Sequence, residues 1–337
     1  MKNFKGKIAF ITGGASGAGL GQAKVFSKAG MRVAIADVRE EALAAAVKEI
    51  VAYSGCAESD VLSIRFDLTD REAYKAASDL VEKTFGGPPH LLIQTAGVNS
   101  FGPIEASTFD DFDWVVGVCF NAVVNGLLIF VPRMIKSYAN KEEFHVATTS
   151  SMGAFMAGST TGPYSAAKAA VNNLMYSYAE ALKPYGAGAT VLCPGNINSN
   201  IGDAEKFRPA HLKNTGYHVS EGTMKTLRAI HAMGIDPVEL GEILKEGIEN
   251  GRVIVLPDHD PDGRAAMIRS QNEVIEAYTF TAEKREAYME EKMKAFMPPV
   301  NEDSGPPPSM WGVPEGGEAF GQARRDLDYV DDDKKAK

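Results

Sequence analysis

Short apolar runs rich in β-branched residues alternate with longer segments of helical period, and this alternation limits the fold more than any other feature of the chain. The segments between the early runs, residues 17–28, 40–53 and 70–85, have the length and spacing of helices. This strand and helix order predicts an α/β fold, in which a doubly wound parallel sheet carries helices on both faces. We expect seven strands, at residues 7–12, 31–36, 61–66, 91–95, 144–149, 189–192 and 252–256.

The pattern also predicts how the chain is divided. Residues 1–260 are expected to form one domain, in which residues 201–233 interrupt the strands with Pro, Gly and polar residues and predict a lid over the carboxyl edge of the sheet, where such folds bind ligands. Residues 261–297 have helical spacing and predict a helical C-terminal extension. Residues 298–337 form a Pro/Gly-rich acidic tail that lacks the apolar content of a core, and we expect it to be mobile.

Charge and cysteine content exclude several classes of function. The formal net charge is 35 − 44 = −9, which disfavours binding to nucleic acid or to an anionic membrane. The apolar stretches 8–11 and 127–131 are too short for a signal-peptide core and a membrane span, so we expect no membrane segment. Cys56, Cys119 and Cys193 show no CxxC or zinc-ligand spacing, which favours a reducing compartment and a cytoplasmic protein.

A glycine-rich loop follows the first expected strand and opens the first expected helix. Backbone amides at such a helix start can bind a pyrophosphate, because the absent side chains let the ligand approach the backbone. A glycine loop alone is weak evidence, but its place between a strand and a helix, with an acid at the end of the next strand, makes the pattern specific. The loop residues expected to touch the cofactor are Thr12, Gly13, Ser16, Gly17, Ala18 and Gly19.

The acid of this pattern is Asp37, and it favours NAD as the cofactor. Its carboxylate can accept hydrogen bonds from both ribose hydroxyls and would repel the 2′-phosphate of NADP. Arg39 keeps NADP open as an alternative, although a solvated charge at the start of the next helix is the simpler interpretation. Asp67 and Leu68 follow the third strand and either contact the adenine ring or, for Asp67, form an N-cap or turn.

Three polar side chains form a candidate catalytic group. Tyr164 and Lys168 are four residues apart, which places a phenol and an ammonium on one face of a helix. Ser151 lies just after the fifth strand, and Pro194-Gly195 follow the sixth. A core Tyr, a surface Lys or a loop Ser is ordinary when taken singly, but all of these segments fall at the same sheet edge as the glycine loop.

The chain resembles the short-chain dehydrogenase/reductase family over about residues 7–256, in the type, order and spacing of its motifs. These motifs are the loop 12–19, Asp37, Ala96-Gly97, Ser151, Tyr164-x-x-x-Lys168 and Pro194-Gly195. The resemblance implies a single Rossmann-like domain with strand order 3-2-1-4-5-6-7 that associates through helices into homodimers or homotetramers. It also implies that Tyr164 is the general base, that Ser151 holds the substrate oxygen, and that Lys168 binds the nicotinamide ribose. A free phenol has a pKa of about 10, and the charge of Lys168 is expected to lower it. The further cofactor contacts that the resemblance implies are Ala96, Gly97, Pro194, Gly195, Ile197 and Ser199.

The chain departs from the family pattern in two places. Gln94-Thr95 replace the usual pair of asparagines after the fourth strand, while the small residues that pass near the cofactor remain, so we expect cofactor binding to survive. Cys119 stands where the family has a fourth catalytic Asn, which holds a helix kink and offers its main-chain carbonyl to a water. Asn121 points in another direction on the helix and should not substitute for it. Because a carbonyl survives any substitution, we expect activity to be retuned or impaired rather than abolished.

Within the family, the chain resembles the bacterial Cα-dehydrogenases that oxidise the benzylic alcohol of lignin β-aryl ethers, through 11–19 with 21–26, 95–105, 162–170, 199–201 and 208–210. This resemblance implies NAD-dependent oxidation of an aryl secondary alcohol to a ketone. An aromatic and polarizable set of side chains would suit a methoxylated ring, although the same residues could simply pack the loops. The candidate pocket residues are Asn99, Ser100, Phe101, Met152, Phe155, Met156, Asn200 and Tyr217.

The sequence leaves two alternative functions open and excludes a metal site. The same catalyst could be a carbonyl reductase or a hydroxysteroid-type dehydrogenase, and a chain of another class could be an NAD-binding sensor that has lost turnover. The small-molecule partner is therefore a secondary alcohol or a ketone. We expect no metal, because the six histidines are scattered and the calcium-like run 258–263 has Arg269 where a bidentate Glu is needed.

Overall fold

The computed structural model of the chain describes residues 1–257, 261–276 and 286–291. The sheet, its covering helices and the candidate site all belong to the compact unit Met1–Glu273. Two sequence expectations lie outside the described residues, namely the acidic tail 298–337 and residues 258–260 of the calcium-like run. Of the expected helical extension 261–297, the structure describes helix α9 (Pro261–Glu276) and the helical residues 286–291.

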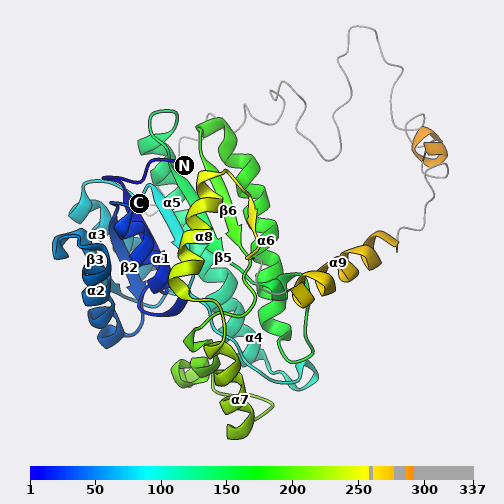
Figure 1. Ribbon diagram of the computed structural model, residues 1–337. Helices are drawn as coiled ribbons and strands as arrows, with labels where there is room; N and C mark the ends of the chain where they lie inside the picture. The colour runs from blue at the N-terminus through cyan, green and yellow to red at the C-terminus, as the bar shows by residue number, and fades with distance from the viewer. Residues whose placement is uncertain (258–260, 277–285, 292–337) are drawn as a thin grey trace, which may run out of the picture. The chain divides into compact units, whose positions relative to one another are not determined.

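The core of the molecule is a seven-stranded sheet in which every strand pair is parallel (Figure 1). The strand order is β3-β2-β1-β4-β5-β6-β7, which confirms the predicted fold class and strand order. The chain passes from β1 outward to β3 and then returns to the other side of β1 through β4, so a switch in direction lies between β1 and β4. The strands are β1 (Ile8–Thr12), β2 (Arg32–Asp37), β3 (Val61–Arg65), β4 (Leu91–Gln94), β5 (His145–Thr149), β6 (Gly188–Leu192) and β7 (Ile254–Val255).

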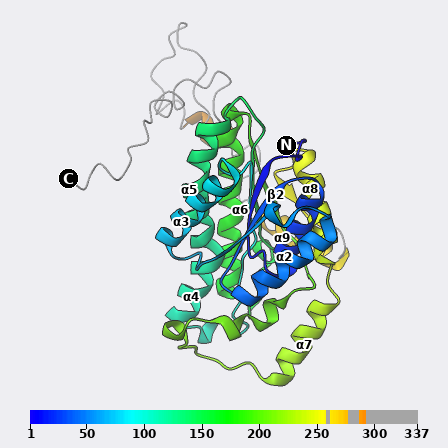
Figure 2. The same cartoon turned by 90° about the vertical axis from the view of Figure 1, so that its left-hand side faces the viewer.

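Helices cover both faces of this sheet, as Figure 2 shows edge on. Alternate residues of β1 pack into two separate cores. Phe10 lies against Tyr74 and Phe130, with ring centroids 6.2 and 4.7 Å away, whereas Ile11 packs in the opposite core with Phe26. The helices are α1 (Gly17–Lys28), α2 (Glu40–Ser54) and α8 (Pro237–Glu249) on one face, and α3 (Arg71–Phe85), α5 (Ala122–Tyr138) and α6 (Gly162–Leu182) on the other.

Local sequence signals set several helix ends. The Asp70 side chain accepts hydrogen bonds from the first amides of α3, and Asp236 does the same for α8, which has Pro237 at its first position. Helices α2 and α3 end at Gly55 and Gly86, whose φ angles of 71° and 85° are left-handed. The turns that return the chain to the sheet are therefore encoded next to the helices themselves.

Helix α4 (Phe109–Val116), a π-helical turn at Gly117–Asn121 and α5 form one continuous helical stretch. Among the residues that the structure describes, this stretch, Phe109–Tyr138, is the one helix long and apolar enough to cross a membrane by length and composition. Its most apolar part is 56% buried inside the fold, as in the core helix of a soluble protein. The apolar character of this helix therefore reflects its packing under the sheet.

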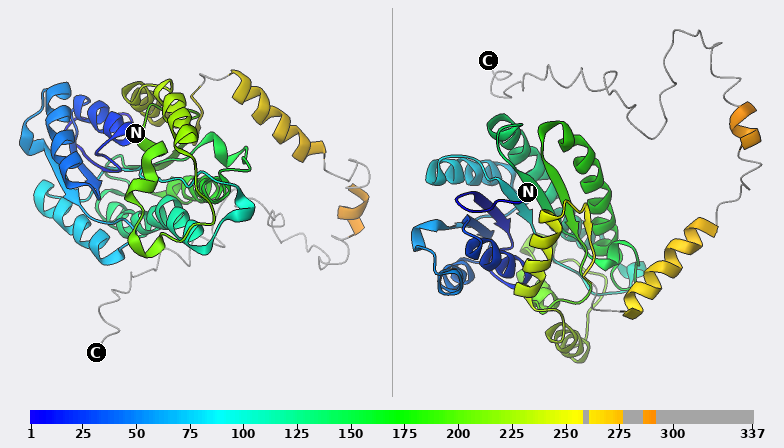
Figure 3. Two further views of the ribbon diagram at one scale, coloured as in Figure 1. Left: turned by 90° about the horizontal axis from the view of Figure 1, so that it is seen from below. Right: turned by 45° about the horizontal axis from the view of Figure 1, so that its top comes forward.

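The region of the predicted lid consists of short turns and one helix at the carboxyl end of the sheet. The 3₁₀ turns Asn200–Phe207 and Ala210–Leu212 are followed by α7 (Glu221–Ala232). Both α4 and α7 lie at this end in Figures 1 and 2, and the left panel of Figure 3 looks at it from below. This placement brings residues from the second half of the chain next to the glycine loop.

Candidate active site

The glycine loop after β1 is closed tightly against its neighbours. Gly13 has a left-handed φ of 67°, and a Cβ there would lie 2.9 Å from the Ala96 backbone. A Cβ at Gly19 would collide with the carbonyl of Gly13. The Thr12 hydroxyl accepts hydrogen bonds from the amides of Thr95 and Ala96 at 3.0 and 3.2 Å, so the loops after β1 and β4 are tied together. The loop has the compact, amide-lined shape that a pyrophosphate needs.

The acid at the end of β2 is paired with an arginine. Arg39 donates from Nε and Nη2 to the two carboxylate oxygens of Asp37 at 2.9 and 2.8 Å, and Nη2 also donates to the Ser16 hydroxyl at 2.8 Å. The predicted solvated charge is therefore wrong for Arg39, because its side chain turns back onto Asp37 and is 24% exposed. The hydrogen bond to Asp37 raises the pKa of the Arg39 guanidinium further. Asp37 and Arg39 both line one cleft with the glycine loop.

Asp67 forms the turn that was one of the two interpretations the sequence left open. Its carboxylate accepts hydrogen bonds from the amide and hydroxyl of Thr69 at 2.9 and 2.7 Å, which is the bond of a turn acid. Asp67 and Leu68 also line the cleft next to Asp37, at the edge where an adenine ring would lie. The contact with adenine stays a prediction.

Ser151, Tyr164 and Lys168 meet at the carboxyl ends of β5 and β6. Tyr164 and Lys168 lie one turn apart on α6, with the ammonium nitrogen 5.6 Å from the centre of the phenol ring. The Lys168 side chain is buried and donates to the carbonyl oxygen of Thr149 at 2.8 Å, which fixes it at the end of β5. Gly153 leaves room between the other two, since a Cβ there would lie 3.4 Å from the Ser151 hydroxyl and 3.7 Å from the Tyr164 ring.

Burial sets the charge preferences of this group. It raises the pKa of Tyr164 above that of a free phenol, and a hydrogen bond with Ser151 offsets part of this rise. Burial also lowers the pKa of the Lys168 ammonium. The net direction for Tyr164 is opposite to the lowering that we expected from Lys168, because burial of the phenol outweighs the hydrogen bond with Ser151.

The first departure from the family pattern, Gln94-Thr95, forms hydrogen bonds of its own. Gln94 accepts from the Tyr74 hydroxyl at 3.1 Å and donates to the carbonyl of Val123 at 3.0 Å, which ties β4 to α3 and α5. Thr95 donates to Gln22 at 2.5 Å and lies 2.9 Å from the hydroxyl of Thr149. The loop that passes the cofactor site is therefore held by different side chains from those of the usual asparagine pair.

The second departure, Cys119, lies inside the π-helical turn. Its buried thiol donates to the carbonyl of Val98 at 3.1 Å and accepts from the Val98 amide at 3.4 Å. Burial raises the pKa of this thiol, so it is neutral, while the nearby Lys168 lowers the pKa in part. A distortion of the helix is thus present at the position where the family has its Asn, and Cys119 holds the loop after β4 to it.

A single cleft gathers most of the predicted cofactor residues. Thr12 and Pro194 do not line it. The carbonyl of Pro194 accepts a hydrogen bond from the Met152 amide at 2.9 Å. Gly195 is also absent from its lining. The predicted residues that do line it are Gly13, Ser16, Gly17, Ala18, Gly19, Asp37, Asp67, Leu68, Ala96, Gly97, Tyr164, Lys168, Ile197 and Ser199.

The cleft also has lining residues that sequence reasoning missed. Trp114 resembles an ordinary core residue of an amphipathic helix, and Phe207 lies in a segment without regular period, so neither carried a signal beyond the predicted lid. Arg39 also lines the cleft, although the sequence predicted a solvated charge there, with a phosphate partner as the alternative. The missed lining residues are Val38, Thr95, Val98, Trp114, Val118, Thr149, Ser150, Ile201, Ala204, Phe207 and Pro209.

The structure distributes the predicted substrate residues over three places. Asn200 lines the cleft together with Tyr164. Tyr217 packs directly on Gly102, where a Cβ would collide with its ring, so the loop holding Asn99 and Phe101 meets the far end of the lid region. Phe155 packs against the core cluster, and Met152 lies beside Gly195. Their contacts with substrate stay predictions.

This arrangement can bind a dinucleotide and move a proton. The cradle at Gly13 and Gly19 fits a pyrophosphate, and Asp37 fits a ribose. The partly buried phenol of Tyr164 and the buried ammonium of Lys168 line the other end of the same cleft. Within the described residues, no group of three or more His, Cys, Asp or Glu side chains could hold a metal ion.

Comparisons with known proteins agree with this geometry. The family model described as short chain dehydrogenase matches residues 7–208. The "C alpha-dehydrogenase" of Sphingobium sp. (strain NBRC 103272 / SYK-6) is 50% identical over 257 residues, covering 76% of this chain and 82% of that protein. The apo crystal structure of LigD from Sphingobium sp. strain SYK-6 has a TM-score of 0.67 at 41% identity, covering 82% of this chain and all of that one. A short chain dehydrogenase/reductase from Burkholderia phymatum in complex with NAD has a TM-score of 0.74 at 29% identity, covering 83% of this chain and 99% of that one.

Proposed function

The chain belongs to the short-chain dehydrogenase/reductase family, and from this membership we propose that it oxidises an aryl secondary alcohol to a ketone with NAD. The observation that carries the proposal is the cleft itself. One end holds the glycine loop and Asp37, and the other end holds Tyr164 and Lys168. A cofactor that spans the cleft would place its reactive end at the phenol, which is the position a dehydrogenase requires.

Each member of the catalytic group has a role that follows from its position. Tyr164 is the base that takes the alcohol proton, and Ser151 donates a hydrogen bond to the substrate oxygen. Lys168, held by the carbonyl of Thr149, provides the positive charge that favours the phenolate of Tyr164. A nicotinamide cofactor held by the glycine loop and Lys168 would supply the acceptor for the hydride of the carbinol carbon. The proton leaves through the phenol at the same site.

The cofactor is NAD rather than NADP in this proposal. Asp37 presents a carboxylate at the ribose end of the cleft, and a 2′-phosphate there would face this charge. Arg39 is already neutralised by its two hydrogen bonds to Asp37, so it offers a phosphate less attraction than a free guanidinium would. The relative from Burkholderia phymatum was crystallised in complex with NAD, which supports the same choice.

The substrate class is a benzylic alcohol such as that of a lignin-derived β-aryl ether. The half-identical relative is named as a C alpha-dehydrogenase, and its similarity extends over three quarters of this chain. Trp114 and Phe207 add aromatic surface to the cleft. Aromatic walls of this kind suit an aryl substrate.

We also propose a cytoplasmic homodimer or homotetramer. Free thiols at Cys56, Cys119 and Cys193 suit a reducing compartment. Leu128 on α5 and Tyr176 on α6 are 57% and 38% exposed, and apolar side chains on these neighbouring helices suit contact with a second copy.

The test follows NADH absorbance when the purified protein meets NAD and a panel of aryl secondary alcohols that includes a β-aryl ether dimer. The Tyr164→Phe variant removes the proton acceptor and should lower turnover by roughly 10³-fold or more while NAD still binds. Tyr53→Phe is the matched control, because Tyr53 lies on α2, is exposed and does not line the cleft. Activity with hydroxysteroids alone, or in the reduction direction alone, would favour the rival dehydrogenases. If no substrate produced NADH while NAD still bound, the result would favour an NAD-binding sensor.

A further inference from the structure

Two adjacent residues in the segment Asn200–Tyr217, which we call the cover segment, contact opposite sides of the cofactor cleft. The ring of Phe207 lies 5.3 Å from the guanidinium carbon of Arg39, which belongs to the ribose end of the cleft. The guanidinium of Arg208 instead contacts α4. The cover segment therefore crosses from the Asp37 side of the cleft to the α4 side within two residues.

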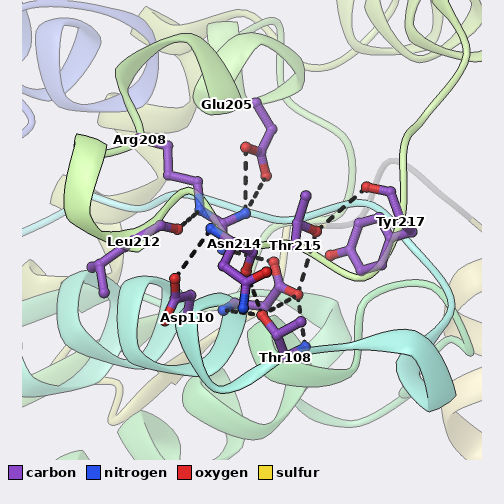
Figure 4. A network of polar contacts seen from close by, with 9 residues as sticks. Thr108, Asp110, Glu205, Arg208, Leu212, Asn214, Thr215 and Tyr217 are labelled. Carbon is purple, nitrogen blue, oxygen red and sulfur yellow. Dashed lines mark hydrogen bonds and ion pairs between the residues drawn. The ribbon is translucent and has the colours of Figure 1, made fainter.

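Arg208 has a partner for each of its nitrogen atoms (Figure 4). Nη2 donates to Asp111 at 2.7 Å, Nη1 donates to Glu205 at 3.2 Å, and Nε donates to the carbonyl of Leu212 at 2.5 Å. Its guanidinium carbon also lies 4.9 Å from the centre of the Trp114 ring. The Arg208 side chain is 2% exposed and that of Asp111 is fully buried, so this is an ion pair removed from water.

The start of α4 is built to receive this pair. The second oxygen of Asp111 accepts hydrogen bonds from the amide and hydroxyl of Thr108, and the Thr215 hydroxyl lies 3.4 Å from it. Burial works against the charge of Asp111, but the bonds from Thr108 and Arg208 outweigh it and lower its pKa. The amide of Asn214 donates to Asp110 at 3.1 Å, so a second point of the cover segment is attached to the same helix end.

Besides α4, the cover segment is attached through Ala204, which is buried against Trp114, and through the ion pair of Asp203 with Arg228 at 2.9 Å, but Phe207 itself has a weaker contact. Phe207 is 48% exposed, and its described contact across the cleft is with Arg39, whose own bonds go to Asp37 and Ser16. A ring stacked on a partly exposed guanidinium contributes about 0.5–1 kcal/mol. Removing one partner of a buried ion pair costs about 3–5 kcal/mol, which is far more. The buried pair of Arg208 with Asp111 is the attachment adjacent to Phe207 in the chain, so it has the most direct effect on where that ring lies.

We propose that Arg208 and Asp111 are positioning residues that hold Phe207 over the adenosine end of the cleft, where its ring retains bound NAD or NADH. The proposal rests on the proposed function in one respect, because it takes the ligand of the cleft to be this dinucleotide. Arg208 anchors the cover segment on α4, and Phe207 is the residue that contacts the cofactor. Loss of either one opens the adenosine end and speeds cofactor release.

The experiment measures NADH release by stopped-flow fluorescence, with excess NAD as the competitor, in the full-length protein. Phe207→Ala and Arg208→Lys should each raise the release rate by about tenfold. Lysine keeps a charge beside Asp111, but its single nitrogen cannot replace the planar guanidinium whose three separate nitrogens reach Asp111, Glu205 and the Leu212 carbonyl. Arg133→Lys is the control, because Arg133 joins α3 to α5 through Asp79 and Glu82, away from the cleft.

A double variant separates anchoring from general loss of structure. If Arg208 acts through Phe207, then Phe207→Ala with Arg208→Lys should release NADH no faster than Phe207→Ala alone. The proposal would be overturned if the double variant released NADH at a rate equal to the product of the two single increases. It would also be overturned by an unchanged release rate in Phe207→Ala, which should fold normally because Phe207 is exposed. A release rate for Arg208→Lys that matches Arg133→Lys would also overturn it. NADH release does not depend on any alcohol, so failure here leaves the proposed oxidation standing, and an inactive panel leaves the anchor standing.

Discussion

The catalytic wall, formed by Ser151, Tyr164 and Lys168, and the cover segment Asn200–Tyr217 are built from different kinds of contact. In the wall, Tyr164 and Lys168 share one helix, and the helical period alone brings them to the same face. The cover segment has 3₁₀ turns and depends on Arg208 and Asp111, which are 97 residues apart in the chain. The catalytic side chains are therefore placed by a short-range helical pattern. The segment that covers the cofactor cleft is placed by a buried ion pair between residues far apart in the chain.

Removal of the buried acid should have the largest effect on stability. Asp111→Ala removes the fully buried carboxylate and leaves Arg208 with the partly exposed Glu205, so it should lower the free energy of unfolding by about 3 kcal/mol. Asp203→Ala is the matched control, since Asp203 pairs with Arg228 at 2.9 Å in the same region but both side chains are partly exposed. That change should cost less than about 1 kcal/mol. Denaturant unfolding measures both, and equal losses would mean that burial of the Arg208 pair has no special weight.

Most of the sheet and the wall could be predicted from the sequence, because their signals are local. The strand runs, the glycine loop and the Tyr164 to Lys168 spacing each occupy a few neighbouring residues, and the structure places them as expected. The cover segment offered Pro, Gly and polar residues but no period. Nothing in the sequence pairs Asp111 with Arg208, since both look like ordinary surface charges.

The pH dependence of alcohol oxidation tests the wall separately from the cover segment. The base form of Tyr164 is its phenolate, and burial raises the pKa of this group, so the active fraction is small at neutral pH and grows as pH rises. The rate under saturating NAD should therefore increase about tenfold per pH unit below that pKa. The increase should end where Lys168, whose pKa burial lowers, loses its proton. Phe207→Ala should keep the same profile, and a shifted profile would show that the cover segment also affects the base.

The ribose end of the cleft joins the two regions, because Asp37 belongs to a local motif while its partner Arg39 contacts Phe207. Asp37→Ser removes the charge that repels a 2′-phosphate and frees Arg39, so the preference for NAD over NADP should fall by roughly tenfold. Asp67→Ser is the control, because Asp67 lines the cleft at its adenine edge and should change both affinities alike. Affinities measured by fluorescence titration decide, and an unchanged preference would show that Asp37 does not select the cofactor.

Arg39 also shows a limit of sequence reasoning. Its place at the start of α2 was correctly expected, but the direction of its side chain was not. A guanidinium two residues from a buried carboxylate can point to water or fold back, and its direction here depends on Ser16 and Phe207, which come from other parts of the chain. The same holds for the pKa of Tyr164, whose direction follows from burial that no motif reports.

The smallest effect is expected at Cys119, where the sequence suggested impaired or retuned activity. The π-helical turn at Gly117–Asn121 is already formed, and the thiol holds both backbone groups of Val98. An Asn at this position offers one donor and one acceptor for the same two groups at similar size, so Cys119→Asn should change turnover by less than about threefold. Cys193→Ser is a matched control, because Cys193 is also buried and hydrogen-bonded, through Asn172. A tenfold gain in turnover for Cys119→Asn would mean that the π-helical turn of the native chain is not in its optimal position. The catalytic wall would then depend on a contact outside the Tyr164 to Lys168 spacing.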